Sequence, residues 1–219
     1  PNAITLTVNQ PETREMSNCC YYQFGRKDPM CRVERPEVGA ITLSSLGGKV
    51  SLGKAIQNPD TYYFTKPNSG YSDWCSTNYY NLWSGAADVS RVQTAGMVKT
   101  IYDPSPVGYK MPAAEVCTGF TTTGMSSTRL WQFNVVGDYN YGYNFLTGTG
   151  YNPSSVLFRS TGRRNGTDGT LDLMDIGDFW TACSFNDKRG YSFGFWQDNV
   201  SVCSDFAKAH AYSVRPVQE

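Results

Sequence analysis

The chain has 219 residues, enough for one domain with a sizeable core, and its formal net charge is zero. Zero net charge provides no positive field to attract nucleic acids or anionic membranes, and no apolar run reaches the ~18 residues of a membrane span. Twenty-one Gly, eleven Pro and fifteen Tyr, with only 17% charged residues, are typical of a secreted or cell-surface domain of short strands and turns.

The first half of the chain predicts short elements separated by turns. Residues 4–8 alternate at the period of a strand, within an N-terminal extension over residues 1–19. The apolar run that starts at Cys19 ends at the turn signal Asp28-Pro29. Residues 57–73 are irregular and rich in aromatics. Pro112 is a good first-turn residue, so we expect a short helix over residues 113–120.

The second half predicts strands joined by turns, beginning at Leu130. Segments 130–136, 137–145 and 156–171 follow one another, and Asn165-Gly166 is a strong signal for a tight turn. The last strands are expected at 191–196 and 211–217. We therefore expect little helix and mostly antiparallel strands.

Catalytic and cofactor motifs are missing from the sequence. No P-loop, GxGxxG, HExxH or GxSxG pattern occurs, and His210 is the only histidine. Asp172, Asp175 and Asp178 form the densest acidic cluster, which the nearby glycines place in a solvated loop. We expect no catalytic residue, no metal site and no cofactor.

The seven cysteines have neither CxxC nor zinc-finger spacing. An odd number leaves at least one unpaired within the chain. Disulfides and buried thiols that behave as small hydrophobes both fit this pattern.

Five motifs resemble one family in their order and spacing. They are YYQFGRKDP (21–29), DWCSTNYYNLW (73–83), YDPSPVGYKMP (102–112), DFWTA (178–182) and AYSVRPVQE (211–219). Together they resemble the C-type-lectin-like domains of surface lipoproteins and fimbrillins of Bacteroides-type gut bacteria. The resemblance covers most of the chain, from about Cys20 to Glu219.

The resemblance implies an α+β, C-type-lectin-like fold: one domain over residues 1–219, with short antiparallel strands, one or two short helices and long loops. It also implies a secreted or cell-surface protein, either an outer-membrane lipoprotein or a pilus-associated protein. The Glu-Pro-Asn signature of calcium-dependent lectins is absent, so calcium-dependent sugar binding is not expected. Six motif residues are assigned to the scaffold: Arg26, Asp28, Tyr102, Asp103, Trp180 and Arg215.

Residues 179–212 are the candidate ligand-binding region. By position and composition, this interval is similar to the variable region of target proteins of diversity-generating retroelements. Alternation places Tyr191, Phe193 and Phe195 toward the core, and Ser192, Gly194 and Trp196 on the other face. The candidate ligand-binding residues are Phe185, Asp187, Lys188, Arg189, Trp196, Asp198, Asp205, Phe206, Lys208 and His210.

Three positive and three negative side chains balance in this region. Exposed aromatics beside charges of both signs are typical of interfaces, which favours a protein or glycan ligand on another cell or surface. The alternative is that Trp196 and Phe206 complete the core.

The resulting functional hypothesis is a non-enzymatic binding protein, adhesin-like or a retroelement variable protein. Two alternatives stay open. One is a structural or tip pilin subunit with residues 4–8 as a packed or exchanged strand. The other is an enzyme of the formylglycine-generating type, which would need Cys183 and Cys203 to meet in the fold.

Overall fold

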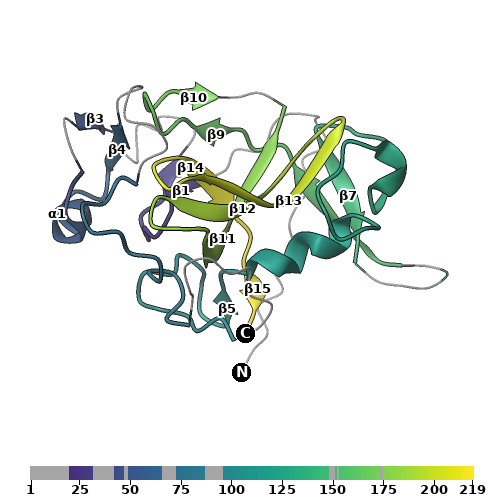
Figure 1. The fold of residues 1–219 in the computed structure, drawn as a ribbon, viewed down its shortest axis with the longest axis horizontal. Coiled ribbons are helices and arrows are strands. Elements are labelled where there is room, and N and C mark those ends of the chain that lie inside the picture. The colour runs from purple at the N-terminus through teal and green to yellow at the C-terminus, as the bar shows by residue number, and fades with distance from the viewer. Residues whose placement is uncertain are drawn as a thin grey trace.

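The fold is mostly strand with a few short helices, which confirms a mixed α+β class (Figure 1). The computed structural model describes residues 20–31, 42–46, 49–65, 73–86, 96–147, 151, 153–172 and 175–219. Within these ranges, no helix has the length and hydrophobicity needed to cross a membrane. The strand expected at residues 4–8 lies outside the described residues.

The N-terminal elements are β1 (Cys20–Gln23), β2 (Met30–Cys31), β3 (Thr42–Leu46), α1 (Leu52–Gln57) and β4 (Thr61–Thr65). The middle of the chain forms β5 (Tyr109–Lys110), the 3₁₀ helices η2 (Ala114–Phe120) and η3 (Leu130–Gln132), and β6 (Val135–Val136), β7 (Gly142–Leu146) and β8 (Ser155–Arg159). The C-terminal part forms β9 (Arg163–Arg164), β10 (Leu171–Asp172), β11 (Gly177–Ser184), β12 (Arg189–Trp196), β13 (Asn199–Ala207), β14 (Ala211–Val214) and β15 (Val217–Gln218).

The main sheet has the strand order β10-β9-β14-β11-β12-β13, and β1 joins it by pairing with β14 and β2. Smaller sheets are β6-β7-β8, β5-β15 and β3-β4. Most pairs are antiparallel, as expected, whereas β11-β14 and β3-β4 are parallel. Figure 1 shows β11, β12 and β13 at the centre of the molecule, with η2 beneath them.

Both faces of β11 and β12 are covered by aromatic side chains. On one face Phe179 packs against Phe193 and Phe195. On the other, Trp180 stacks on Tyr212 with ring centroids 4.3 Å apart. The prediction that Tyr191, Phe193 and Phe195 are core residues is confirmed, since all three are buried. Their placement on one face is wrong for Tyr191, which packs in the Trp180 cluster, because the register of β12 shifts between Ser192 and Gly194. β11 is buried along its whole length, although its sequence GDFWTACS includes the polar residues Asp178, Thr181 and Ser184.

Local signals located several elements correctly. The helix expected after Pro112 is η2, although its turns are 3₁₀. The Asn165-Gly166 signal lies in the loop between the antiparallel strands β9 and β10. The strand expected over 130–136 is confirmed only at its end, as β6, because η3 occupies its start.

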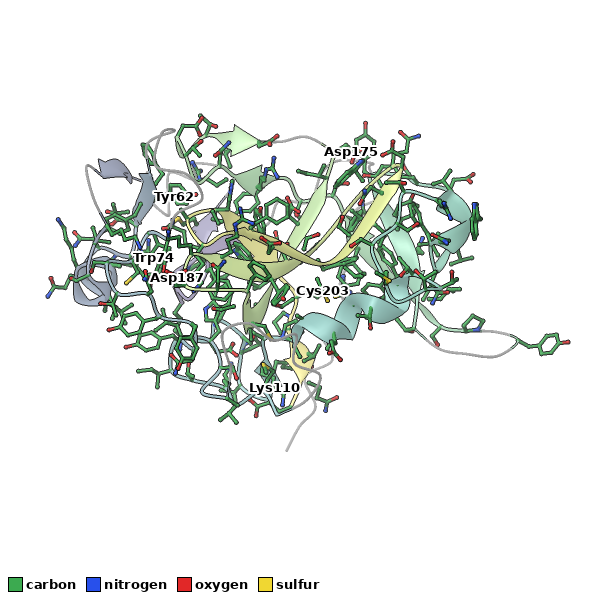
Figure 2. All side chains as sticks on the ribbon, in the orientation of Figure 1. Tyr62, Trp74, Lys110, Asp175, Asp187 and Cys203 are labelled. Carbon is green, nitrogen blue, oxygen red and sulfur yellow. The ribbon has the colours of Figure 1, made fainter. Side chains whose placement is uncertain are left out.

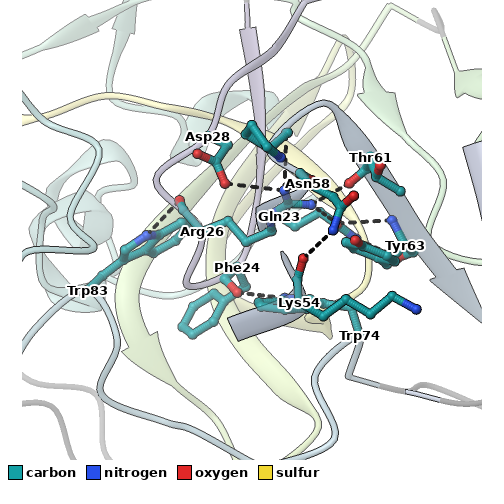
Figure 3. Close-up of polar contacts among 11 residues, drawn as sticks. Gln23, Phe24, Arg26, Asp28, Lys54, Asn58, Thr61, Tyr63, Trp74 and Trp83 are labelled. Carbon is teal, nitrogen blue, oxygen red and sulfur yellow. Dashed lines mark hydrogen bonds and ion pairs between the residues drawn. The ribbon is translucent and has the colours of Figure 1, made fainter. Parts of the chain in front are cut away.

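A buried arginine joins β1 to the segment between α1 and β4 (Figure 3). The Arg26 guanidinium donates hydrogen bonds to the side chains of Gln23 and Asp28 and to the carbonyls of Asn58, Pro59 and Thr61. The indole of Trp83 donates to the Arg26 carbonyl at 3.1 Å. A cation buried in this way requires such acceptors, so the assignment of Arg26 to the scaffold is confirmed.

Asp103 has a similar structural role before β5. Its carboxylate accepts hydrogen bonds from the backbone N–H groups of Ser105 and Met111 at 2.7 and 2.9 Å and from the Lys99 ammonium at 3.0 Å. The carboxylate thereby fixes the proline-rich turn over residues 103–111. Asp103 and Trp180 are each 1% exposed, which is consistent with scaffold roles for both.

Candidate ligand-binding groove

A groove of about 860 Å³ opens beside the β12–β13 hairpin. It is lined by Leu130 of η3, Arg163 of β9, Asp175 and Ile176 of the β10–β11 connection, Asp178 of β11, Trp196, Gln197 and Asp198 at the hairpin turn, and Phe206 of β13. The groove therefore combines aromatic, apolar and charged side chains from six parts of the sequence.

Two aromatic residues that line the groove come from opposite ends of the β12–β13 ladder. Phe206 lies opposite Gly190 in the β12–β13 ladder, and Trp196 lies opposite Asn199 at the other end. Six strand positions separate Gly190 from Trp196, which corresponds to roughly 20 Å at the rise of a β-strand. The backbone positions of Trp196 and Phe206 are therefore well separated along the hairpin, although both side chains line the same groove.

Trp196 presents an accessible aromatic face. It ends β12, directly before the turn, and is 41% exposed. The turn itself is held because the Tyr143 hydroxyl donates to the Gln197 carbonyl at 2.6 Å. Phe206 is partly buried, with its ring edge-on to Tyr212 at 5.6 Å. The alternative that both rings complete the core is therefore wrong for Trp196 and partly correct for Phe206.

Arg163 organises the charged side of the groove. Its guanidinium forms an ion pair with Asp172 at 3.0 Å and a longer one with Asp178 at 3.5 Å. Burial raises the pKa of Asp178 to about 6, while the positive charge of Arg163 opposes that shift. Gly194, opposite Asp178 in the sheet, makes room for this carboxylate, since a Cβ there would lie 2.8 Å from Asp178 Oδ1.

The acidic cluster was expected to be a solvated loop, and that expectation is wrong for two of its members. Asp172 lies in β10 and Asp178 in β11, and both contact Arg163. Asp175 is exposed, and it accepts a hydrogen bond from the Tyr139 hydroxyl at 2.9 Å. The strand order brings Arg163 between these carboxylates, which residue spacing alone does not reveal.

The predicted ligand-binding residues divide into separate groups. Trp196, Asp198 and Phe206 line the groove. Phe185, Asp187, Lys188 and Arg189 lie at the β11–β12 turn, at the opposite end of β12 from Trp196. Figure 2 shows Asp187 well apart from Asp175, which lines the groove. Asp205 forms an ion pair with Arg189 and does not line the groove.

Lys208 does not lie on the expected surface, and this placement is corrected. The residue is 1% exposed, and its ammonium donates to the Tyr79 carbonyl at 2.9 Å and to the Asp187 carbonyl at 3.4 Å. It lies over the Phe24 ring, 5.3 Å from the centroid. Burial lowers the pKa of Lys208 to about 8. Lys208 therefore has a structural role inside the protein.

His210 is also internal, contrary to the expected surface position. It is 9% exposed, and its Nδ1 accepts a hydrogen bond from the Gly166 N–H at 3.0 Å. Burial lowers the pKa of His210 to about 4, so the ring is neutral at physiological pH. Both corrections have the same cause. Beyond β13 the chain turns inward, and residues 207–213 are all buried.

Two thiols near β13 are poorly suited to nucleophilic chemistry. Burial raises the pKa of Cys117 to about 12 and that of Cys203 to about 11. A reactive cysteine needs a substantial thiolate fraction, which these environments oppose. Across the described ranges, no group of three or more His, Cys, Asp or Glu side chains is placed to hold a metal ion.

Sequence reasoning missed Leu130, Arg163, Asp175, Ile176, Asp178 and Gln197 as groove residues. Two features of the sequence could have indicated some of these residues. One is the apolar-aromatic pair Leu130-Trp131, which the structure exposes by 61% and 73%, and the other is the density of aspartates before β11.

Comparisons with known proteins found no match among protein-family models, curated proteins or solved structures. The fold and its groove thus define a mostly β, mixed α+β protein with a groove lined by aromatic and acidic side chains.

Proposed function

We propose that this protein is a non-enzymatic ligand-binding protein of the cell surface or extracellular space, and that the groove is its recognition site. The observation that carries the proposal is the Trp196 indole, 41% exposed at the edge of a groove that also presents charged side chains. A large ring held by a sheet loses little conformational freedom on binding, which is why such residues dominate interface energetics.

A C-type-lectin-like scaffold, similar to retroelement variable proteins, is part of this proposal. Its support is the order of the five sequence motifs and the mostly β architecture with few short helices. Motif residues such as Arg26, Asp103 and Trp180 are buried, whereas the β12–β13 turn is exposed. In such a scaffold, the buried motif residues maintain the fold, and the residues of the exposed hairpin contact the ligand.

Recognition on this surface needs no bond chemistry. Trp196 and Phe206 supply apolar contact area, while Asp175 and Asp198 accept hydrogen bonds at the accessible rim. The formylglycine-generating alternative requires Cys183 and Cys203 to meet, and the two pack in the same core cluster. Burial raises the pKa of Cys203 to about 11, which does not favour the reactive thiolate that this alternative also needs. The pilin alternative depends on residues 4–8, which lie outside the described residues.

The test is a binding screen of immobilised extracellular proteins and glycans with the wild-type protein and Trp196→Ala. Trp131→Ala is the matched control, because Trp131 is 73% exposed and does not line the groove. We expect Trp196→Ala to weaken binding by about tenfold or more, and Trp131→Ala to bind as the wild type does. Equal binding by wild type and Trp196→Ala would exclude the groove as the recognition site.

A further inference from the structure

We infer that the groove accepts the cationic side chain of an arginine or lysine within an extended segment of a protein partner. This inference rests on the proposed function, since it names the class of ligand that the same groove takes. The observations behind it are the excess of carboxylates in the groove, the two aromatic side chains that line it and the spread of the lining residues along the hairpin.

The charge balance of the groove is negative. Asp175, Asp178 and Asp198 line it with only one guanidinium, that of Arg163. The Arg163 charge is already shared with Asp172, which lies outside the lining. Asp198 comes from the hairpin itself, whereas Asp175, Asp178 and Arg163 are added by other segments and together increase the negative excess. A ligand that complements such a surface carries positive charge, and an anionic ligand is repelled.

Asp178 has unused capacity to accept hydrogen bonds. It is 5% exposed and lines the groove, yet its only side-chain hydrogen bond within the described part of the chain is the 3.5 Å contact from Arg163. Tyr212, which is fully buried, lies close enough to Asp178 and Arg163 to interact with both electrostatically, but it does not line the groove. The Asp178 carboxylate therefore retains lone pairs toward the groove that an incoming N–H donor would fill.

The aromatic rings favour the same chemistry. The face of Trp is the best partner for a cation among side chains, and guanidinium groups stack on it. Trp196 is accessible within the groove, with Asp198 two residues away in the same lining. An aromatic face beside carboxylates matches a flat, charged guanidinium better than a neutral group.

The positions of the lining residues favour a peptide segment over an isolated small cation. Trp196 and Phe206 both line the groove, and their backbone positions are separated along the hairpin by roughly 20 Å, the span of about six residues of extended chain. The exposed apolar side chain of Leu130 lies in the same lining and provides contact area for a neighbouring residue of the partner. A glycan would use the Trp196 face but not the charge excess, so we treat glycan binding as an outcome that overturns the inference.

The experiment uses three acetylated and amidated hexapeptides, identical except for one central residue: arginine, its neutral isostere citrulline, or glutamate. Binding is followed by NMR of the indole N–H of Trp196, identified by its loss in Trp196→Phe. We expect saturable shifts with the arginine peptide and binding about tenfold weaker or worse with the other two.

Variants test whether the carboxylates of the groove cause the preference for the arginine peptide. Asp175→Asn/Asp198→Asn changes two exposed carboxylates of the groove and is not expected to disturb folding. We expect it to weaken binding of the arginine peptide by about fivefold. Asp60→Asn, an exposed aspartate outside the groove, is the matched control and should bind as the wild type does.

Three results would overturn the inference: equal binding of the arginine and citrulline peptides, stronger binding of the glutamate peptide, or no indole shift at about 10 mM arginine peptide. The binding screen with Trp196→Ala separates the two proposals. If that screen finds a groove-dependent glycan or acidic ligand, only the cationic inference fails. If it finds no groove-dependent ligand and the peptides also fail, the proposed function fails as well.

Discussion

Arg163 Nη1 lies 3.5 Å from Asp178 Oδ2 at the wall of the groove, although fifteen residues separate the two in sequence. The contact exists because β9 and β11 both flank β14 in the main sheet. It places a guanidinium next to a carboxylate that is 5% exposed, and so limits the cost of burying that negative charge. This pair links the stability of the sheet to the electrostatics of the groove.

Replacing Arg163 with methionine should destabilise the protein. Asp178 would lose its opposing charge while remaining buried, so its pKa should rise further above its present value of about 6. Removing one partner of a buried pair typically costs about 3–5 kcal/mol, and partial exposure of Arg163 favours the lower end. Urea unfolding at pH 7 measures the change. The exposed Arg129→Met is the control, and an equal loss in both variants would argue against the pair.

Gly194→Ala should weaken ligand binding in the groove more than it lowers the stability of the rest of the fold. A Cβ at this position would lie 2.8 Å from Asp178 Oδ1, so the carboxylate must move away from its place on the sheet. We expect binding of the arginine hexapeptide to fall by about fivefold. Gly119→Ala is the matched control, because a Cβ there meets nothing within 4 Å. Unchanged affinity in Gly194→Ala would show that the position of Asp178 is unimportant.

Lys208→Met should reduce stability and leave ligand binding intact. The substitution removes the hydrogen bonds to the Tyr79 and Asp187 carbonyls, and it removes the positive charge that lowers the pKa of Asp73. We expect a loss of about 2–4 kcal/mol in the free energy of unfolding, measured with urea. Lys188→Met, at an exposed position, should have little effect. A loss of binding without a loss of stability would contradict this structural role and would support the ligand-binding role that the sequence predicted for Lys208.

His210 should contribute to acid sensitivity. Its folded pKa is about 4, below the ordinary 6.5, so the folded state disfavours the charged ring. The stability that the neutral ring provides is therefore complete above pH 6.5 and is lost as the pH falls through about 4. The full shift corresponds to roughly 3 kcal/mol.

The measurement compares wild type with His210→Gln between pH 7 and pH 4. Glutamine retains an acceptor for the Gly166 N–H but does not titrate in this range. Asp73 and Asp178, whose pKa values burial raises to about 6, add an opposite trend in both proteins. The difference between the two curves isolates His210. Parallel curves would mean that the ring is not held neutral by the fold.

The sequence by itself determined the features that depend on neighbouring residues. Alternation over residues 191–196 identified Phe193 and Phe195 as core and Trp196 as accessible, because side-chain direction in a strand follows from position along it. Pro112 marked the start of η2, and Asn165-Gly166 marked the connection between β9 and β10. These signals are local because backbone dihedral preferences act within a few residues.

Only the tertiary structure decided which side chains share the groove and which lie inside. The order β10-β9-β14-β11 brings Arg163 beside Asp172 and Asp178, and the fold places Asp175 and Asp178 in the same groove as Asp198 of the hairpin. Lys208 and His210 have the chemistry of surface residues, yet the chain folds them inward after β13. Strand order depends on the free energy of the whole core, to which distant residues contribute, and no short stretch of sequence carries that information.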